Sequence, residues 1–378
     1  MNSEMQHSLF EAPLRTQGRH IIDATGTPIK WCSVNWYGAS DELFIPSGLD
    51  TRHRNAIAYQ IRSMGFNTVR LPYSDELVLS NPLVPAELLS ANRDLEGRRA
   101  LDIFDACVVA LTDAGLGVII NNHITQAGWC DGMNLCDASW SNSHLGPVCK
   151  IRQTEEQWIT HWTTLMSRPS IKDNPRVLGC DLRNEPRGLW GTTSWGSWAR
   201  AATKCGDRLL AVNSDWLIIV EGIGSANDCS GARKTPIHLA VPNRLVYSVH
   251  VFAWSGWGSM NPYSKRPYPG FVLSMQKNWA FLLDEDIAPV WVAELGNADN
   301  PTEGDLHYWT NLMRYLEHTD ASWGYWAINP RKPKDNLPET WGLIRDDWAT
   351  TIEDYRMQSL RKLMPQKSKE PESQGLEQ

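Results

Sequence analysis

The sequence predicts an α/β fold: a single (β/α)8 TIM barrel, in which eight parallel strands alternate with helices. Short apolar runs rich in β-branched residues alternate with segments of helical period along most of the 378 residues. These runs lack the polar–apolar alternation of a half-exposed sheet, which is typical of parallel strands buried on both faces. No linker, composition shift or internal repeat divides residues 20–363, so we expect one catalytic domain there.

The predicted elements follow each other regularly. The strands are 26–36, 66–72, 116–123, 176–186, 216–222, 244–251, 289–296 and 321–330. The helices are 51–64, 99–114, 154–168, 195–212, 271–284, 304–318 and 350–363. Ser, Thr or Asp stands near several helix starts, as an N-cap requires. Only the connection from Glu221 to Arg244 lacks a clear helical pattern.

Both ends of the chain are expected to lie outside the barrel wall. The segment HIIDATGTP (20–28) predicts a short hairpin that turns at Thr25-Gly26 and closes the N-terminal end of the barrel. Residues 364–378 are polar and charged without an apolar face, so we expect a disordered tail.

Composition and charge exclude several classes of partner. Apolar residues make up 42% and charged residues 21%, and the net charge is −7. We therefore expect no nucleic acid or anionic membrane as a partner. No apolar run approaches the about 20 residues that span a bilayer, and the opening residues lack the apolar core of a signal peptide. The chain is expected to be a soluble monomer.

Tryptophan is unusually frequent. The chain has 19 Trp against 7 Phe and 10 Tyr. Indoles offer flat, amphipathic surfaces on which sugar rings stack, although filling of a large core remains the alternative for any single Trp.

The eight cysteines do not form a metal-binding pattern. There is no CxxC and no Cys/His spacing of the zinc type. Cys130, Cys136 and Cys149 crowd one Gly/Asn/Ser-rich stretch, as in a loop stapled by a disulfide, but the connectivity stays open. Buried thiols are expected at Cys32, Cys107 and Cys180, which lie in apolar runs.

Polar side chains mark the C-terminal ends of the predicted strands, where barrels bind ligands. They are Arg70, His123, Asn184, Glu185, Glu221, His250, Glu294 and the aromatic Trp326. Glu185 and Glu294 should face each other across the barrel mouth. Paired carboxylates carry out glycoside hydrolysis, with one protonating the leaving oxygen and the other acting at the anomeric carbon. For either Glu alone, pairing with an Arg is the structural alternative.

The order and spacing of these motifs resemble glycoside hydrolase family five, in its cellulase-like branch. The resemblance rests on Asn184-Glu185-Pro186, on Glu294 before Leu-Gly, and on NTVRLP, NNH, YSVHV and Trp326, and it spans residues 20–345. It implies that Glu185 is the general acid/base and Glu294 the nucleophile. Asn184 would donate to the sugar 2-hydroxyl, and Arg70 would orient Glu294 and keep it ionised.

The resemblance also implies sugar contacts by other residues. They are Trp326 as a platform and His123 and His250 at the glycone, although a structural histidine is the alternative for each His. By position alone, four tryptophans on loops after strands three, six and eight are further candidates for stacking sugars, with anchoring of the loop as the alternative: Trp129, Trp254, Trp257 and Trp341. The stretch 129–149 would form one wall of the cleft. Glu221 fits a structural or cleft-lining role better than a catalytic one.

One position departs from the family pattern. The family has a Tyr two residues after the strand-six His, and its hydroxyl donates to the nucleophile. This chain has Phe252 there, and strand alternation turns Tyr247 to the opposite face from His250. Either another donor compensates, or Glu294 is less well held.

These observations predict a retaining β-glycoside hydrolase without a cofactor or metal, with a β-1,4-glucan as the first-choice substrate and endo action. The alternatives are another β-glycan (mannan, galactan or β-1,3/1,6-glucan), an exo-acting β-glucosidase, a metal-dependent barrel hydrolase using His123 and His250, and a non-catalytic carbohydrate-binding barrel. Family habit and the even cysteine count favour secretion, whereas the missing leader and missing N-glycosylation sequons favour the cytoplasm.

Overall fold

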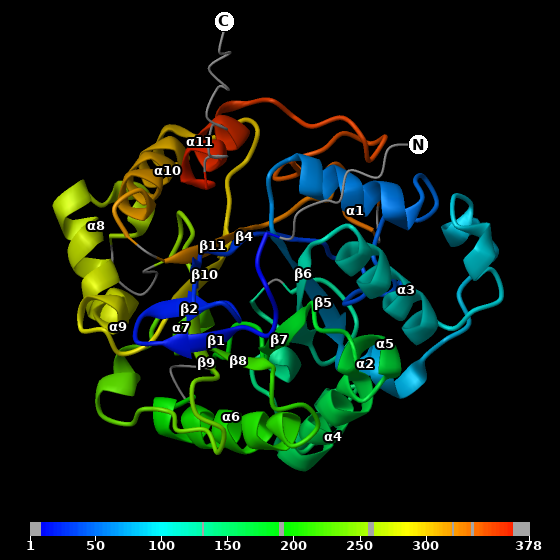
Figure 1. Cartoon of the computed structure of the whole chain (residues 1–378), viewed down its shortest axis with the longest axis horizontal. Coiled ribbons are helices and arrows are strands. Elements are labelled where there is room, and N and C mark those ends of the chain that lie inside the picture. The colour runs from blue at the N-terminus through cyan, green and yellow to red at the C-terminus, as the bar shows by residue number, and fades with distance from the viewer. Residues whose placement is uncertain are drawn as a thin grey trace, which may run out of the picture.

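A closed barrel of eight parallel strands forms the centre of the molecule, and helices surround it (Figure 1). The computed structural model describes residues 9–130, 132–188, 193–255, 261–319, 321–333 and 336–365. The barrel strands are β4 (Cys32–Asn35), β5 (Thr68–Ser74), β6 (Gly117–Ile124), β7 (Val177–Asp181), β8 (Leu217–Glu221), β9 (Leu245–His250), β10 (Val290–Leu295) and β11 (Ser322–Tyr325). The predicted (β/α)8 fold is confirmed.

The helices of the described chain occupy all seven predicted ranges, and three further short helices, at 75–80, 169–172 and 223–226, were not predicted. They are α1 (Arg54–Ser63), α2 (Asp75–Ser80), α3 (Ala100–Asp113), α4 (Glu155–Met166), α5 (Pro169–Lys172), α6 (Trp195–Leu210), α7 (Ile223–Ala226), α8 (Tyr268–Met275), α9 (Phe281–Asp284), α10 (Glu303–Leu316) and α11 (Tyr355–Leu363). Reciprocal capping boxes start α4, between Thr154 and Gln157, and α10, between Thr302 and Asp305. Between Glu221 and Arg244 the chain forms only the four-residue α7 and a short 3-10 turn, as the absence of a helical pattern there indicated.

The first predicted strand divides in two. Pro28–Ile29 (β3) joins β2 (His20–Ile22) and β1 (Arg15–Gln17) in a small antiparallel sheet, and only Cys32–Asn35 enters the barrel. The carboxylate of Asp23 accepts hydrogen bonds from the backbone of Thr25 and Thr27 and shapes the turn between β2 and β3. The expected hairpin is therefore present, with one strand more than predicted.

This small sheet closes one end of the barrel. Phe10, Leu14 and Ile21 join an apolar cluster with barrel residues such as Ile119 and Trp291. In Figure 1, β1 and β2 lie across the barrel in front of its strands. The N-terminal ends of the strands are therefore sealed, and the opposite ends remain for chemistry.

Many tryptophans and most cysteines belong to the core. The fully buried indoles are those of Trp31, Trp36, Trp158, Trp162, Trp198, Trp216, Trp279, Trp291 and Trp323, so core filling accounts for much of the tryptophan excess. Cys136 and Cys149 form a disulfide. The predicted buried thiols are buried, whereas Cys130 is a half-buried free thiol and not part of the staple.

Two predictions lie outside the described residues: the disordered tail, except for 364 and 365, and a sugar contact by Trp257. In the part of the chain that the structure describes, no helix is long and apolar enough to cross a membrane.

Candidate active site

The structure brings the predicted polar residues together at the C-terminal ends of the barrel strands. Arg70 comes from β5, His123 from β6, and His250 and Glu294 from β9 and β10. Glu221 ends β8, and the turn after β7 carries Asn184 and Glu185. These side chains lie together because the C-terminal ends of all the parallel strands meet at the same rim of the barrel.

Arg70 is the centre of this cluster and is fully buried. Its Nε donates to Oδ2 of Asp181 at 2.7 Å, its Nη2 to Oε1 of Glu221 at 2.9 Å, and its Nη1 to Oε1 of Glu294. A guanidinium presents several donors in a rigid fork, so one Arg can hold several carboxylates at once. Arg70 therefore neutralises part of a buried group of three acids.

Asp181 was missed by the sequence interpretation. It ends β7 and is fully buried, and its Oδ2 also accepts from Nδ2 of Asn121 at 2.9 Å. The available signal was a charged residue inside an otherwise apolar strand, because a buried charge requires a partner.

Glu294 is 5% exposed. Burial raises its pKa, against the opposing effects of His250 and Arg70. Its Oε2 lies 3.6 Å from Nδ1 of His250. Arg70 thus supplies a donor to Glu294 that does not depend on the tyrosine missing at Phe252.

Glu185 sits in a strained turn. Its φ is +47°, in the left-handed region that non-glycine residues rarely adopt, at a cost of about 1–3 kcal/mol. Its backbone N–H donates to Oε2 of Glu221 at 2.7 Å. Burial raises the pKa of its carboxyl to about 7, against the opposing charges of Arg187 and Arg70. A carboxyl with this pKa is suited to hold a proton near neutral pH.

His250 links the two candidate catalytic acids. Its Nδ1 is 3.0 Å from Oε1 of Glu185 and 3.6 Å from Oε2 of Glu294. Burial lowers the pKa of His250 to about 4, so the imidazole is neutral near pH 7. One ligand-type atom from each of the three residues lies within 4.8 Å of the others. His123, which the metal-dependent alternative required, is not part of this group, and its Nδ1 faces Oδ1 of Asn121 at 2.9 Å.

Asn184 is held by its carbonyl oxygen. Oδ1 accepts from Nη2 of Arg70 at 2.8 Å. Its Nδ2 lies 3.7 Å from Sγ of Cys130, which is also 3.9 Å from Nη1 of Arg187. Cys130, which precedes the disulfide-closed loop, therefore contacts Asn184 and Arg187 at the site, and the sequence did not predict these contacts.

Two groups of aromatic rings stand at the barrel mouth. The Trp326 cluster comprises Tyr37, His123, Trp129 and Trp326. Within it Trp326 stacks with His123 and Tyr37 at ring-centre distances of 5.2 Å and 5.1 Å. Trp129 is 44% exposed and carries Nζ of Lys332 above its ring at 4.6 Å. Tyr37 and Lys332 were not predicted as members of the site.

The Phe252 cluster comprises Phe252, Trp254 and Trp341. Phe252 stacks on Trp254 at 4.6 Å and meets the edge of His250 at 6.4 Å. Trp254 is 54% exposed. Tyr247 lies elsewhere, with its hydroxyl accepting from the backbone N–H of Ile237, in agreement with the predicted strand alternation.

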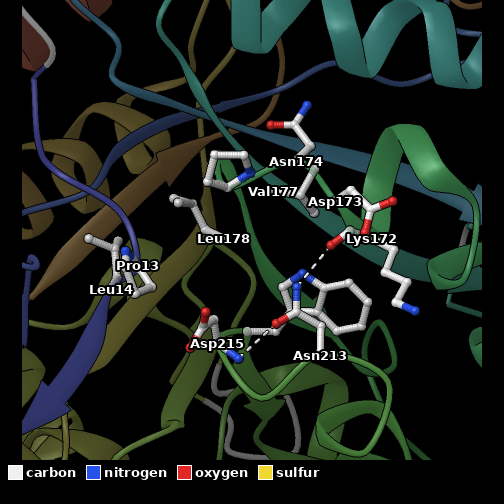
Figure 2. A pocket seen from close by; sticks show the side chains of 11 residues that line it. Pro13, Leu14, Lys172, Asp173, Asn174, Val177, Leu178, Asn213 and Asp215 are labelled. Carbon is white, nitrogen blue, oxygen red and sulfur yellow. Dashed lines mark hydrogen bonds between the residues drawn. The ribbon is translucent and has the colours of Figure 1, made fainter.

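A separate pocket of about 220 Å³ lies at the other end of the barrel, beside the starts of β7 and β8. Figure 2 shows Lys172, Asp173 and Asn174 on one side of it, with Asn213 and Asp215 on another. None of the predicted site residues lines it, so it is distinct from the acid cluster.

Comparison with known proteins gives a consistent result. The family model "Cellulase (glycosyl hydrolase family 5)" matches residues 22–332. An endoglucanase from Paenibacillus polymyxa is 30% identical over 351 residues, covering 89% of this chain and 83% of that protein. The major extracellular endoglucanase of Xanthomonas campestris pv. campestris is 29% identical, covering 91% of this chain and 70% of that protein.

Solved structures agree with these relatives. The catalytic domain of the major endoglucanase from Xanthomonas campestris pv. campestris has a TM-score of 0.76 and 27% identity, covering 93% of this chain and 99% of that one. An endocellulase from Pyrococcus horikoshii, at 24% identity and a TM-score of 0.75, shares the fold and covers 94% of this chain and 100% of that one. The chain therefore belongs to glycosyl hydrolase family 5.

Proposed function

We propose that this glycosyl hydrolase is a retaining endo-β-1,4-glucanase in which Glu294 is the nucleophile and Glu185 the general acid/base. The observation that carries the proposal is the shared contact of both carboxylates with His250, while Arg70 donates to Glu294. An ionised acid and a protonated acid side by side are the requirement of double displacement.

In the first step the carboxylate of Glu294 attacks the anomeric carbon, and the bond from that carbon to the glycosidic oxygen breaks. The proton of Glu185 passes to the departing oxygen, which leaves as a sugar hydroxyl. In the second step water attacks the anomeric carbon, its proton returns to Glu185, and the ester bond to Glu294 breaks. Both acids end in their starting protonation states.

The spacing of the acids favours retention. Oxygens of Glu185 and Glu294 lie within 4.8 Å of each other. Retaining enzymes place their carboxyl groups about 5–5.5 Å apart, whereas inverting enzymes need roughly 6.5–9.5 Å to admit a water molecule. The 4.8 Å limit joins one oxygen of each carboxylate, and this close approach supports the shorter, retaining separation.

A chain-like glucan is supported by the aromatic rings and by the relatives. Exposed Trp129 and Trp254 stand in two different clusters, where each can stack a sugar ring. Two relatives are named endoglucanases, and one of them is named extracellular. Together with the Cys136–Cys149 disulfide, these names support secretion of this chain as a further part of the proposal.

A substrate panel with product analysis tests the proposal. We expect cleavage of carboxymethylcellulose and cellotetraose, with a rapid fall in viscosity of the polymer and with the β-anomer of the product appearing first by NMR. Mannan, galactan and β-1,3-glucan are the comparison substrates, on which we expect slower cleavage. Initial release of the α-anomer would contradict the mechanism, and preference for another polymer would contradict the substrate.

A further inference from the structure

Glu221 is a third buried glutamate at the site, and neither step of the proposed reaction uses it. It ends β8, its side chain is fully buried, and both of its carboxylate oxygens are engaged. Oε1 accepts from Nη2 of Arg70 at 2.9 Å, and Oε2 accepts from the backbone N–H of Glu185 at 2.7 Å. A structural partner of Arg70 would need only the first of these contacts.

The second contact, from the backbone N–H of Glu185, is made where the backbone has an unfavourable conformation. Glu185 has φ +47°, and such a conformation persists only where its surroundings hold it in place. Its N–H is satisfied by Glu221, and the direction of its side chain depends on this backbone conformation. Glu221 is also linked to the carboxyl group of Glu185 through His250. Its Oε1 lies 3.6 Å from Nε2 of His250, and Nδ1 of the same imidazole contacts Oε1 of Glu185.

We propose that Glu221 is a positioning residue for the general acid: it connects Arg70 to the backbone of Glu185 and so aims the Glu185 carboxyl at the glycosidic oxygen. Arg70 would then fix both reacting carboxylates, Glu294 directly and Glu185 through Glu221. The inference rests on the proposed roles of Glu185 and Glu294.

The substitution Glu221→Gln breaks this connection with almost no change in volume. The two donors face different oxygens of Glu221, and a glutamine replaces one of these oxygens with an NH2 donor, so the contact with either the Glu185 N–H or the Arg70 guanidinium is lost. Asp181→Asn is the matched control, because it also removes a buried carboxylate from Arg70, whereas the Asp181 carboxylate accepts from Arg70 and Asn121 and not from the backbone of Glu185.

The readout is the dependence of the rate on the leaving group. Cellotetraose has a poor leaving group that needs a proton from Glu185, whereas 2,4-dinitrophenyl β-cellobioside releases its phenolate with little protonation. A misplaced general acid loses part of its typical 10²–10⁴-fold contribution, so Glu221→Gln should lower kcat/KM for cellotetraose about tenfold more than for the aryl glycoside. Asp181→Asn should lower both values by a similar factor.

Equal losses on both substrates with Glu221→Gln would overturn the proposal, as would the same selectivity with Asp181→Asn. If the Glu221→Gln variant does not fold, a measurement on the unmodified protein still tests the proposal. By NMR, the Glu185 amide proton should be shifted downfield and exchange slowly, as expected for a short bond to a buried carboxylate. A rapidly exchanging amide would overturn the proposal. If the protein cleaved neither substrate, the proposed function would fail, while the amide measurement would still decide whether the connection exists.

Discussion

Nδ1 of His250 lies 3.0 Å from Oε1 of Glu185. Burial keeps this imidazole neutral by lowering its pKa to about 4, so it can donate or accept one hydrogen bond without adding a charge. A neutral neighbour leaves the raised pKa of Glu185 in place, whereas an imidazolium at the same distance would lower it. This relationship is the basis of the acid and nucleophile assignments tested below.

Substitutions of the two acids should differ in their dependence on the leaving group. Glu294→Gln removes the nucleophile and should abolish turnover of every substrate. Glu185→Gln should spare the first step for aryl glycosides with good leaving groups, because these need little protonation. The measurements are initial rates on 2,4-dinitrophenyl β-cellobioside and on cellotetraose.

Azide provides a second test of the same assignment. It should rescue Glu185→Ala with a β-glycosyl azide product and Glu294→Ala with an α-glycosyl azide, because it replaces water in the first variant and the nucleophile in the second. A loss of all turnover with Glu221→Gln, equal to that with Glu294→Gln, would require a different nucleophile.

The alkaline limb of the pH profile should follow Glu185. A general acid works only while protonated, so kcat/KM should fall as pH rises through about 7. Arg187 lowers the pKa of Glu185, and Arg187→Gln should therefore move this limb upward, by up to about one pH unit. The control is Arg168→Gln, because Arg168 pairs with Asp102 and Asp105 on α3. A downward shift with Arg187→Gln would be incompatible with Glu185 as the acid.

The disulfide should contribute measurably to stability. Cys136 and Cys149 are 13 residues apart, and closing a loop of that length restricts the unfolded chain by about 3 kcal/mol in the loop-entropy model. The double variant Cys136→Ala/Cys149→Ala should lower the free energy of unfolding by about this amount in urea titrations.

Cys130→Ala is the control, since Cys130 is a free thiol in the same stretch and should change stability less. Reductant should weaken the unmodified protein but not the double variant. An unmodified protein that is indifferent to reductant would contradict this prediction.

The sequence predicted several polar residues that the structure brings together at the barrel mouth, but it missed Asp181 at the end of β7. Glu185 and Glu294 lie far apart in the chain, yet a parallel barrel brings strand ends to one rim. The connection from Glu221 to Glu185 could not be predicted, because it depends on a positive φ at a non-glycine residue, which no residue type marks.

The tryptophans show a second limit. Trp129 is exposed and Trp140 is buried, although both come from the same Gly/Asn/Ser-rich stretch 129–149. The exposure of an indole is set by residues distant in sequence that pack against it, so composition alone indicated a sugar-binding surface without saying which rings form it.

Phe252→Tyr should move the acidic limb of the pH profile downward. A nucleophile works above its pKa, and burial raises the pKa of Glu294. The ring of Phe252 lies beside His250, which is itself 3.6 Å from Glu294, and we therefore expect a hydroxyl added to this ring to lie near the nucleophile. A hydrogen bond to a charged group contributes about 1.5–3 kcal/mol, equivalent to roughly one to two pKa units before losses to imperfect geometry.

The matched control is Tyr247→Phe, which removes a hydroxyl from β9, the strand that precedes Phe252, at a position where it accepts from the backbone N–H of Ile237. That variant should leave the acidic limb in place, because its hydroxyl has no contact with either acid. The measurement is kcat/KM on cellotetraose between pH 3 and 7 for the two variants and the unmodified protein. An unmoved limb in a folded, active Phe252→Tyr variant would show either that Arg70 already supplies the hydrogen bond to Glu294 or that the new hydroxyl does not reach it. In the second case, the stacking of Phe252 on Trp254 would be what holds the ring away from the nucleophile.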